Sequence, residues 1–265
     1  MVESPQIKQD VRRVSVIGLG LIGGSIAAGI KQQGLASSVC AWDPNAASLA
    51  LGHDLGIIDS IAADINEATA QSDLIVLAVP VQSMEQVLRD IDLKDQVITD
   101  VGSVKGIAVE AARRVFGELP ENFIPGHPIA GSEKQGVVAA DPNLFRQHKV
   151  ILTPGEASNP AAIARVEKLW NGLGAEVVRM SVSHHDDVLA QTSHLPHLLA
   201  YALVDTLSAG GDSLEVFEYA AGGFRDFSRI AASDPTMWSD IFEANKEPLV
   251  QVLDQYLLKL ETLKQ

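Results

Sequence analysis

The fold of this chain is decided by Gly18-Leu19-Gly20-Leu21-Ile22-Gly23. A short apolar run at residues 14–18 leads into these glycines, and a run of helical character follows at residues 21–33. In such a pattern the first glycine permits a tight turn, the second lets backbone N–H groups approach a pyrophosphate, and the third lets helix pack closely on strand. The pattern therefore predicts a dinucleotide site that includes Gly18, Gly20, Leu21, Ile22 and Gly23.

Asp43 is the second mark of a dinucleotide site. It ends the apolar run at residues 38–43, about 20 residues after the glycines, where an acid binds the hydroxyls of the adenosine ribose. A carboxylate there repels a 2′-phosphate, so the expected cofactor is NAD rather than NADP. The competing interpretation makes Asp43 the N-cap of a helix that begins at Pro44, and both roles are compatible. Val79 and Pro80 end another apolar run and are expected at the same cofactor edge.

Strand-like and helical segments alternate as far as residue 180. Further apolar, strand-like runs lie at residues 74–79, 96–100, 149–153 and 176–179. This alternation predicts an α/β fold, with a doubly wound parallel sheet of the Rossmann type over residues 1–180. From residue 183 onward apolar residues recur only at helical spacing, so residues 181–265 are expected to form an all-helical second domain.

The composition of the 265-residue chain excludes several classes of protein. A net charge of −14 repels a phosphate backbone, so no nucleic-acid partner is expected. The apolar runs are too short to span a bilayer, and residues 1–12 lack the apolar core of a signal peptide. The expectation is a cytoplasmic protein with no membrane partner. No metal is expected either, because the pair His194 and His197 lacks the acid that would complete a known zinc pattern.

Candidate catalytic and substrate-binding residues lie in five places. His127 is expected in a Gly/Pro-rich turn, and Ser103 follows the strand-like run at residues 96–100, where its other interpretation is a helix cap. Pro196 is expected to kink the helix that carries His197. Arg225 and Arg229, with Asp226 to orient one of the two guanidinium groups, suit an anion clamp, although an interdomain salt bridge would use the same residues. Trp238 is a candidate pocket wall or, as its alternative, a core residue.

With these segments the chain resembles the prephenate/arogenate dehydrogenase family of tyrosine biosynthesis, from about residue 13 to residue 262. The matching segments are Gly-Leu-Gly-Leu-Ile-Gly-Gly-Ser at 18–25, Thr-Asp-Val-Gly-Ser-Val-Lys at 99–105, Gly-His-Pro-Ile-Ala-Gly-Ser-Glu at 126–133, Ser-His-Leu-Pro-His at 193–197 and Gly-Gly-Phe-Arg-Asp-Phe-Ser-Arg at 222–229. The resemblance implies NAD-dependent oxidative decarboxylation of prephenate to 4-hydroxyphenylpyruvate.

The resemblance also implies residue roles. His127 would be the base for the 4-hydroxyl, and Ser103 would bond that hydroxyl or His127. Arg229 would hold the ring carboxylate, and His197 would donate to the side-chain carbonyl of prephenate, which favours prephenate over arogenate. The polar residues expected to orient these groups are Glu133, Asp186 and Asp226.

Three alternatives stay open at this point. The first is an arogenate or dual-substrate cyclohexadienyl dehydrogenase that makes tyrosine directly. The second is another dehydrogenase with a helical tail, such as a 3-hydroxy-acid dehydrogenase or a pyrroline carboxylate reductase. The third is a non-catalytic NAD-binding redox sensor. For assembly, the apolar stripes at residues 188–207 and 249–260 predict a homodimer through residues 181–265.

Overall fold

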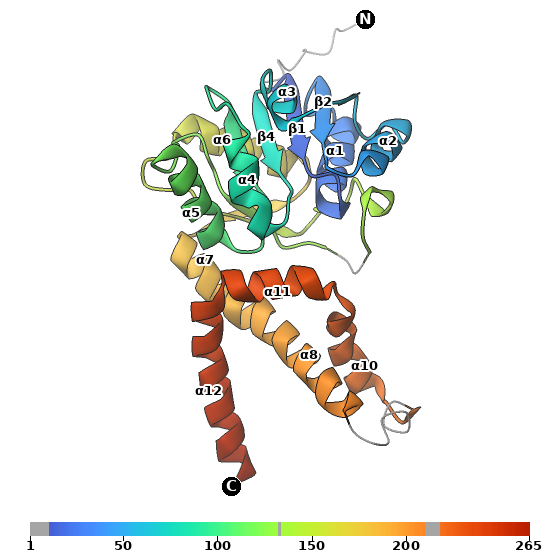
Figure 1. Ribbon diagram of the computed structural model, residues 1–265, viewed down its shortest axis with the longest axis vertical. Coiled ribbons are helices and arrows are strands. Elements are labelled where there is room, and N and C mark those ends of the chain that lie inside the picture. The colour runs from blue at the N-terminus through green and yellow to red at the C-terminus, as the bar shows by residue number, and fades with distance from the viewer. Residues whose placement is uncertain (1–10, 132–133, 210–217) are drawn as a thin grey trace, which may run out of the picture. The chain divides into compact units, whose positions relative to one another are not determined.

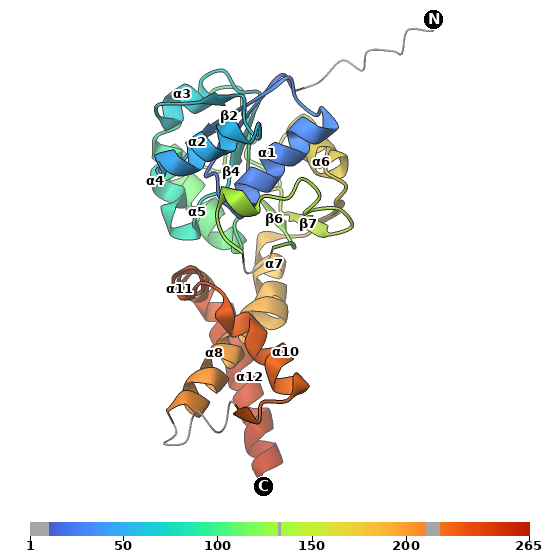
Figure 2. The ribbon, with the colours of Figure 1, turned by 90° about the vertical axis from the view of Figure 1, so that its right-hand side faces the viewer.

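The computed structural model describes residues 11–131, 134–209 and 218–265. The chain forms two compact units, Met1–Val182 and Ser183–Gln265. The first holds every strand of the described chain, and the second is built of helices (Figures 1 and 2). The predicted α/β fold followed by a helical domain is confirmed.

The first unit is organised around a five-stranded sheet in which every pairing is parallel. The strand order is β3-β2-β1-β4-β5. The strands are β1 (Arg13–Ile17), β2 (Ser38–Trp42), β3 (Ser60–Ile61), β4 (Leu74–Leu77) and β5 (Val97–Asp100). The connecting helices are α1 (Leu21–Gln33), α2 (Ala46–Asp54), α3 (Ile65–Thr69), and η1 (Val81–Ser83) with α4 (Met84–Arg89). Because the order reverses after β1, the gap beyond β1 and β4 is the switch point at which such sheets bind ligands.

Alternate residues of each strand enter opposite cores. In β4, Leu74 and Val76 pack toward α1 and α6 (Pro160–Gly172), whereas Ile75 and Leu77 pack toward α4 and α5 (Lys105–Phe116). All four side chains are fully buried. Burial on both faces explains why the central strands are continuously apolar in sequence.

A second, three-stranded sheet follows, and its mixed direction was not predicted. It has the order β6-β7-β8, from β6 (Gly126–Pro128), β7 (Lys149–Leu152) and β8 (Glu176–Arg179). β6 is antiparallel to β7, and β7 is parallel to β8. A bridge between Ile98 and Phe123 joins the segment before β6 to β5. The expectation of a turn at His127 is wrong, because this residue lies within β6 and pairs with Ile151.

The second unit is helical in every described element. Its elements are α7 (Val182–Leu189), a π-helical turn (Ala190–His194), α8 (Leu195–Ser208), α10 (Gly222–Ser228), the 3-10 turn η4 (Arg229–Ala232), α11 (Pro235–Ala244) and α12 (Lys246–Lys264). The predicted irregularity near Pro196 takes the form of the π-helical turn, which passes directly into α8. Such turns occur where an extra residue is accommodated in a helix.

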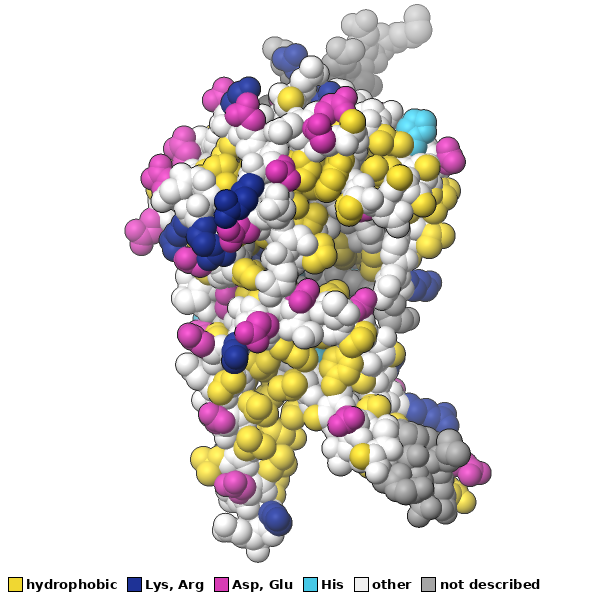
Figure 3. All heavy atoms as spheres, viewed as in Figure 1, with side chains coloured by type: hydrophobic (Ala, Val, Ile, Leu, Met, Phe, Trp, Pro, Cys, Tyr) yellow, Lys and Arg dark blue, Asp and Glu magenta, His cyan; other side chains and the backbone are white. Residues whose placement is uncertain are grey.

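Helix α12 presents apolar side chains to solvent. Figure 3 shows them gathered along the helix, and they include Leu257, Leu258, Leu260 and Leu263. Leu249, in the first turn, is instead buried within the unit. Among the described residues, no helix is both long and apolar enough to cross a membrane.

Candidate active site

The glycine-rich loop between β1 and α1 has the geometry of a pyrophosphate cradle. Gly18 has φ +96°, and a Cβ there would lie 2.3 Å from the Ala78 carbonyl oxygen. A Cβ on Gly23 would lie 2.0 Å from the Gly18 carbonyl oxygen, so only glycine lets α1 pack this closely. At Gly20 nothing lies within 4 Å of an added Cβ. Gly20 is also the N-cap of α1, and no side chain caps this helix; the N–H groups of an uncapped first turn are the kind that bind an anion.

Asp43 is joined to this loop by hydrogen bonds. Its Oδ2 accepts from the backbone N–H of Leu19 at 2.6 Å, and its Oδ1 accepts from that of Asn45 at 2.8 Å. The N-cap of α2 is Asn45, whose side chain accepts from the N–H of Ala47. The alternative role of Asp43 as that N-cap is therefore wrong. Each carboxylate oxygen has a further lone pair, so Asp43 retains capacity for ribose hydroxyls.

The ends of three neighbouring strands lie side by side at this edge. Ile17 pairs with Leu77, and Leu77 pairs with Asp100. The residues that follow are the glycine loop after β1, the half-buried Val79 and exposed Pro80 after β4, and the half-buried Ser103 after β5. A Cβ on Gly18 would lie 3.2 Å from Val79 Cγ1, so Val79 forms part of the wall of the loop.

Ser103 is not a helix cap. Helix α5 begins at Lys105, its N-cap is Val104, and no side chain caps it. The hydroxyl of Ser103 is thus left for another role. His127 is half-buried, and the residue before it, Gly126, is bonded to the end of β5, because its N–H donates to Asp100 Oδ1 at 3.2 Å. The end of β5, which Ser103 follows, therefore lies against the start of β6, which carries His127.

Lys105 and Asp100 form a buried ion pair at this edge, which the sequence analysis did not single out. Both side chains have 0% exposure. Lys105 Nζ donates to Asp100 Oδ2 and, at 2.6 Å, to the carbonyl oxygen of Gly126. The signal available in the sequence was two opposite charges flanking a Gly-Ser loop in an apolar setting.

In the second unit, His197 is stacked on Trp238. The ring centroids are 3.6 Å apart and the planes differ by 17°. Trp238 is 7% exposed, so it is both a core residue and the surface on which His197 rests. His197 Nδ1 lies 2.9 Å from the carbonyl oxygen of Ser193. Since a carbonyl only accepts, Nδ1 carries a proton, and in the neutral ring Nε2 is an acceptor.

Burial lowers the pKa of His197, the bond to Ser193 acts in the opposite direction, and the positive charge of Arg229 lowers the pKa again. The neutral form therefore dominates near neutral pH. The expectation that His197 donates to a substrate carbonyl needs the protonated ring, so the structure favours a different role for the neutral ring.

Asp186 is hydrogen-bonded to His185 and Asn245. Its Oδ1 lies 2.7 Å from His185 Nδ1, and its backbone carbonyl accepts from Asn245 Nδ2 at 2.8 Å. The same amide lies 3.0 Å from His194 Nδ1, which must then be the acceptor. Burial lowers the pKa of His194 to about 4. Asp186 thus belongs to a buried polar group around a neutral His194.

Arg229 and Asp226 are both exposed on the segment of α10 and η4. Among the described residues, no ion pair joins Asp226 to Arg225 or Arg229, so the expected orientation of one of these guanidinium groups by Asp226 is not seen. Glu133 lies outside the described residues. The predicted site residues accordingly fall into two groups, one on each unit.

Comparison with known proteins gives the family. The family model described as the prephenate dehydrogenase nucleotide-binding domain matches residues 26–179, and that of the prephenate dehydrogenase dimerization domain matches residues 181–265. The chain is 38% identical over 259 residues to a cyclohexadienyl dehydrogenase of Zymomonas mobilis, covering 96% of this chain and 87% of that protein. The chain belongs to the prephenate dehydrogenase family.

Two solved structures of similar proteins agree with this assignment. One is a prephenate dehydrogenase from Aquifex aeolicus in complex with hydroxyphenyl propionate and NAD+. It has a TM-score of 0.88 and 37% identity, and the match covers 96% of this chain and 89% of that chain. The other is an arogenate dehydrogenase from Synechocystis, with a TM-score of 0.78, 27% identity and coverage of 95% and 90%. The family makes this chain a dehydrogenase and sets aside the 3-hydroxy-acid dehydrogenase and pyrroline carboxylate reductase alternatives.

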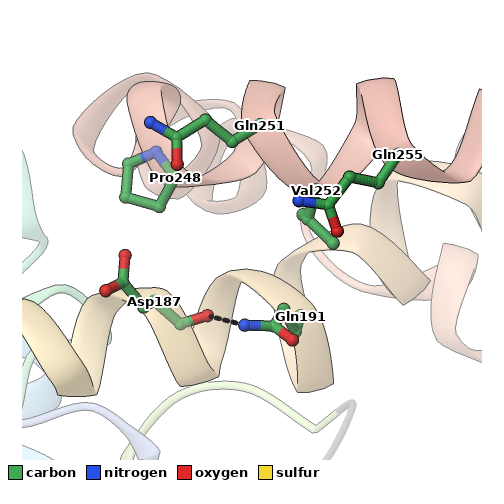
Figure 4. A pocket seen from close by; sticks show the side chains of 6 residues that line it. All are labelled: Asp187, Gln191, Pro248, Gln251, Val252 and Gln255. Atoms are coloured by element: carbon green, nitrogen blue, oxygen red, sulfur yellow. Dashed lines mark hydrogen bonds between the residues drawn. The ribbon is translucent and has the colours of Figure 1, made fainter.

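The helical unit has a pocket of about 200 Å³ between α12 and the segment formed by α7 and the π-helical turn that follows it (Figure 4). Its lining residues are Asp187, Gln191, Pro248, Gln251, Val252 and Gln255. None of them is a predicted site residue, and the Gln191 amide donates to the Asp187 carbonyl at 3.1 Å. The pocket lies on the same helix, α12, as the exposed leucines.

Proposed function

We propose that this protein carries out the NAD-dependent oxidative decarboxylation of prephenate to 4-hydroxyphenylpyruvate, and that it accepts arogenate, giving tyrosine, as a second substrate. The observation that supports the proposal most directly is the bond of Gly126 to Asp100. This bond holds β6, which carries His127, against the end of β5, and the glycine loop follows β1 at the same edge of the parallel sheet. A cofactor bound on the glycine loop would then lie at the same edge of the sheet as His127 and Ser103.

The cofactor fits the residues present, because Gly20 leaves open space at an uncapped helix N-terminus and Asp43 has acceptor capacity for a ribose. The Asp43 carboxylate also disfavours a 2′-phosphate, which selects NAD. Bound NAD supplies the hydride acceptor for C4 of the substrate.

The protein residues supply proton transfer and orientation. His127 accepts the proton of the 4-hydroxyl as C4 loses hydride, and Ser103 holds that hydroxyl through a hydrogen bond. The bond between C1 and its carboxylate then breaks, CO2 leaves, and the electron pair enters the ring, which becomes aromatic. Arg229 binds the carboxylate of the anionic substrate before this step.

The state of His197 supports use of both substrates. Prephenate presents a keto oxygen in its side chain, which only accepts a hydrogen bond, and arogenate presents an ammonium, which only donates. The neutral ring, with its Nδ1 proton held by Ser193, accepts from the ammonium at Nε2. The protonated ring donates to the keto oxygen. The ratio of kcat/KM for prephenate to kcat/KM for arogenate should therefore rise as the pH falls toward the lowered pKa of His197.

The test is initial-rate NADH formation with each substrate across pH values on both sides of neutrality. The expected result is turnover of both, with the ratio rising at acidic pH, and a nearly flat ratio in His197→Asn, which cannot titrate. Turnover of neither substrate would refute the assignment and favour the sensor alternative. A ratio that rises equally in wild type and in His197→Asn would remove His197 as the selecting residue.

A further inference from the structure

The ion pair of Asp100 and Lys105 has contacts to backbone groups on two segments. Asp100 Oδ2 accepts from the N–H of Gly102 at 2.9 Å as well as from Lys105, and its Oδ1 accepts from the N–H of Gly126. Lys105 binds the carbonyl of the same Gly126 at 2.6 Å. Both polar groups of Gly126 are thus held by one charged pair.

The residues that follow Gly102 and Gly126 in the sequence are Ser103 and His127. The pair closes a ring over residues 100–105, and Ser103 lies inside that ring, between Gly102 and Lys105. The Gly126 carbonyl belongs to the peptide bond that enters His127. A shift of the pair would therefore move both predicted catalytic side chains through their own backbone.

Gly102 and Gly126 both lie close against Asp100. A Cβ on Gly102 would lie 3.0 Å from Asp100 Oδ2, and one on Gly126 would lie 3.1 Å from both the Asp100 carbonyl oxygen and Leu152 Cδ2. The Gly102 backbone is thus packed against the Asp100 carboxylate, and the Gly126 backbone against the Asp100 carbonyl group and Leu152, at distances that leave little room for a Cβ.

A buried ion pair is a weak device for stability alone. Its desolvation offsets most of its attraction, and replacing such a pair with neutral groups is often harmless to folding, whereas removing one partner leaves a costly buried charge. Stability therefore gives little reason for two full charges at this edge. Their geometry gives another, because charge-assisted bonds are short and directional.

We propose that Asp100 and Lys105 are positioning residues, which lock the Ser103 loop to the His127 strand in the arrangement needed for proton removal from the substrate. The inference rests on the proposed function, in which Ser103 and His127 act on the substrate hydroxyl. Neither charged side chain contacts the substrate itself, since both are fully buried.

The experiment compares Lys105→Met, Asp100→Asn and the double variant Asp100→Asn/Lys105→Met in the full chain. Lys31→Met is the matched control, because Lys31 also pairs with an aspartate, Asp59, that accepts from a backbone N–H, that of Val39. For each variant we would measure the melting temperature, the Kd for NAD, and kcat and KM for the better substrate.

Lys105→Met should have a lower melting temperature than the wild type, because Asp100 is left as an unpaired buried charge. The melting temperature of the double variant should be close to that of the wild type, since neither substituted side chain carries a charge. In both, kcat should stay lowered by about 10–100-fold, the effect of misplacing a reacting group by about 1 Å, with little change in the Kd for NAD. Asp100→Asn, which leaves the Lys105 bond to Gly126, should lower kcat less. Lys31→Met should leave kcat unchanged.

Recovery of kcat together with the melting temperature in the double variant would overturn the proposal, because the pair would then be only structural. Should Lys105→Met fail to fold, Asp100→Asn and the double variant still decide, and wild-type kcat in both would refute the positioning role. Failure of the proposed function is distinguishable, since it would appear as absence of turnover in the wild type.

Discussion

Alanine substitution at two glycines of the α1 loop separates cofactor binding from folding. Gly20 has φ −86° and nothing within 4 Å of an added Cβ, so Gly20→Ala should fold as well as the wild type, or up to about 1 kcal/mol better. The new methyl would occupy the space of the pyrophosphate, and such overpacking costs about 1–3 kcal/mol, or about 5–150-fold in NAD affinity.

Gly23→Ala has the opposite signature, because its Cβ would lie 2.0 Å from the Gly18 carbonyl oxygen and 3.1 Å from Ala78 Cβ. Helix α1 must move away from the loop in the free protein. The same cost of about 1–3 kcal/mol then falls on folding, which lowers the melting temperature by about 2–4 °C for each kcal/mol.

The assay is thermal unfolding with and without NAD. NAD should raise the melting temperature of the wild type. At an NAD concentration 100 times the Kd, it should add about 2.7 kcal/mol to the free energy of unfolding. Gly20→Ala should keep the wild-type melting temperature without NAD and lose most of the gain, whereas Gly23→Ala should melt earlier in both conditions. A full NAD-dependent gain in Gly20→Ala would refute the placement of the pyrophosphate against Gly20.

Four further predictions concern single roles. His127→Asn should lower kcat by about 10²–10⁴ with little change in KM, and near-normal turnover would eliminate His127 as the base. Asp43→Ser combined with an arginine nearby should narrow the preference for NAD over NADP, and a wild type that uses both equally would contradict the role of Asp43. Arg229→Ala should raise the KM for prephenate, with a loss of about 2–5 kcal/mol in binding, and an equal loss of NAD binding would contradict it. Leu257, which is 47% exposed on α12, should be buried in a two-fold homodimer. Light scattering should therefore report a dimer for the wild type and a monomer for Leu257→Asp. A monomeric wild type would exclude this assembly.

The parallel sheet is predictable from sequence because its residues obey simple rules. Leu74, Ile75, Val76 and Leu77 form a continuous apolar run, which a strand buried on both faces requires. The direction of β6 is not predictable in this way, because three residues are too few to show a period. A Gly-His-Pro sequence is typical of a turn, and pairing with β7 makes it a strand.

The candidate site was predictable only in part. The glycine spacing and Asp43 follow from rules that act within one βαβ unit. The carbonyl group of Ser193, to which His197 donates, belongs to the π-helical turn at Ala190–His194. The apolar periodicity of the segment does not show such a turn. The pair of Asp100 and Lys105 spans a strand end and a helix start, so its charges match neither helical nor strand spacing.

The bond from Leu19 to Asp43 has a consequence for redesigning the cofactor preference. The Asp43 carboxylate, proposed to bind the adenosine ribose, also accepts a hydrogen bond from the loop proposed to bind the pyrophosphate. A substitution of Asp43 chosen to admit a 2′-phosphate also removes the hydrogen bond to Leu19. The affinity for NADP would then rise relative to that for NAD, while the affinity for both cofactors would fall. A successful exchange of specificity therefore requires a paired change: one to receive the new phosphate, and another to return an acceptor to the Leu19 N–H.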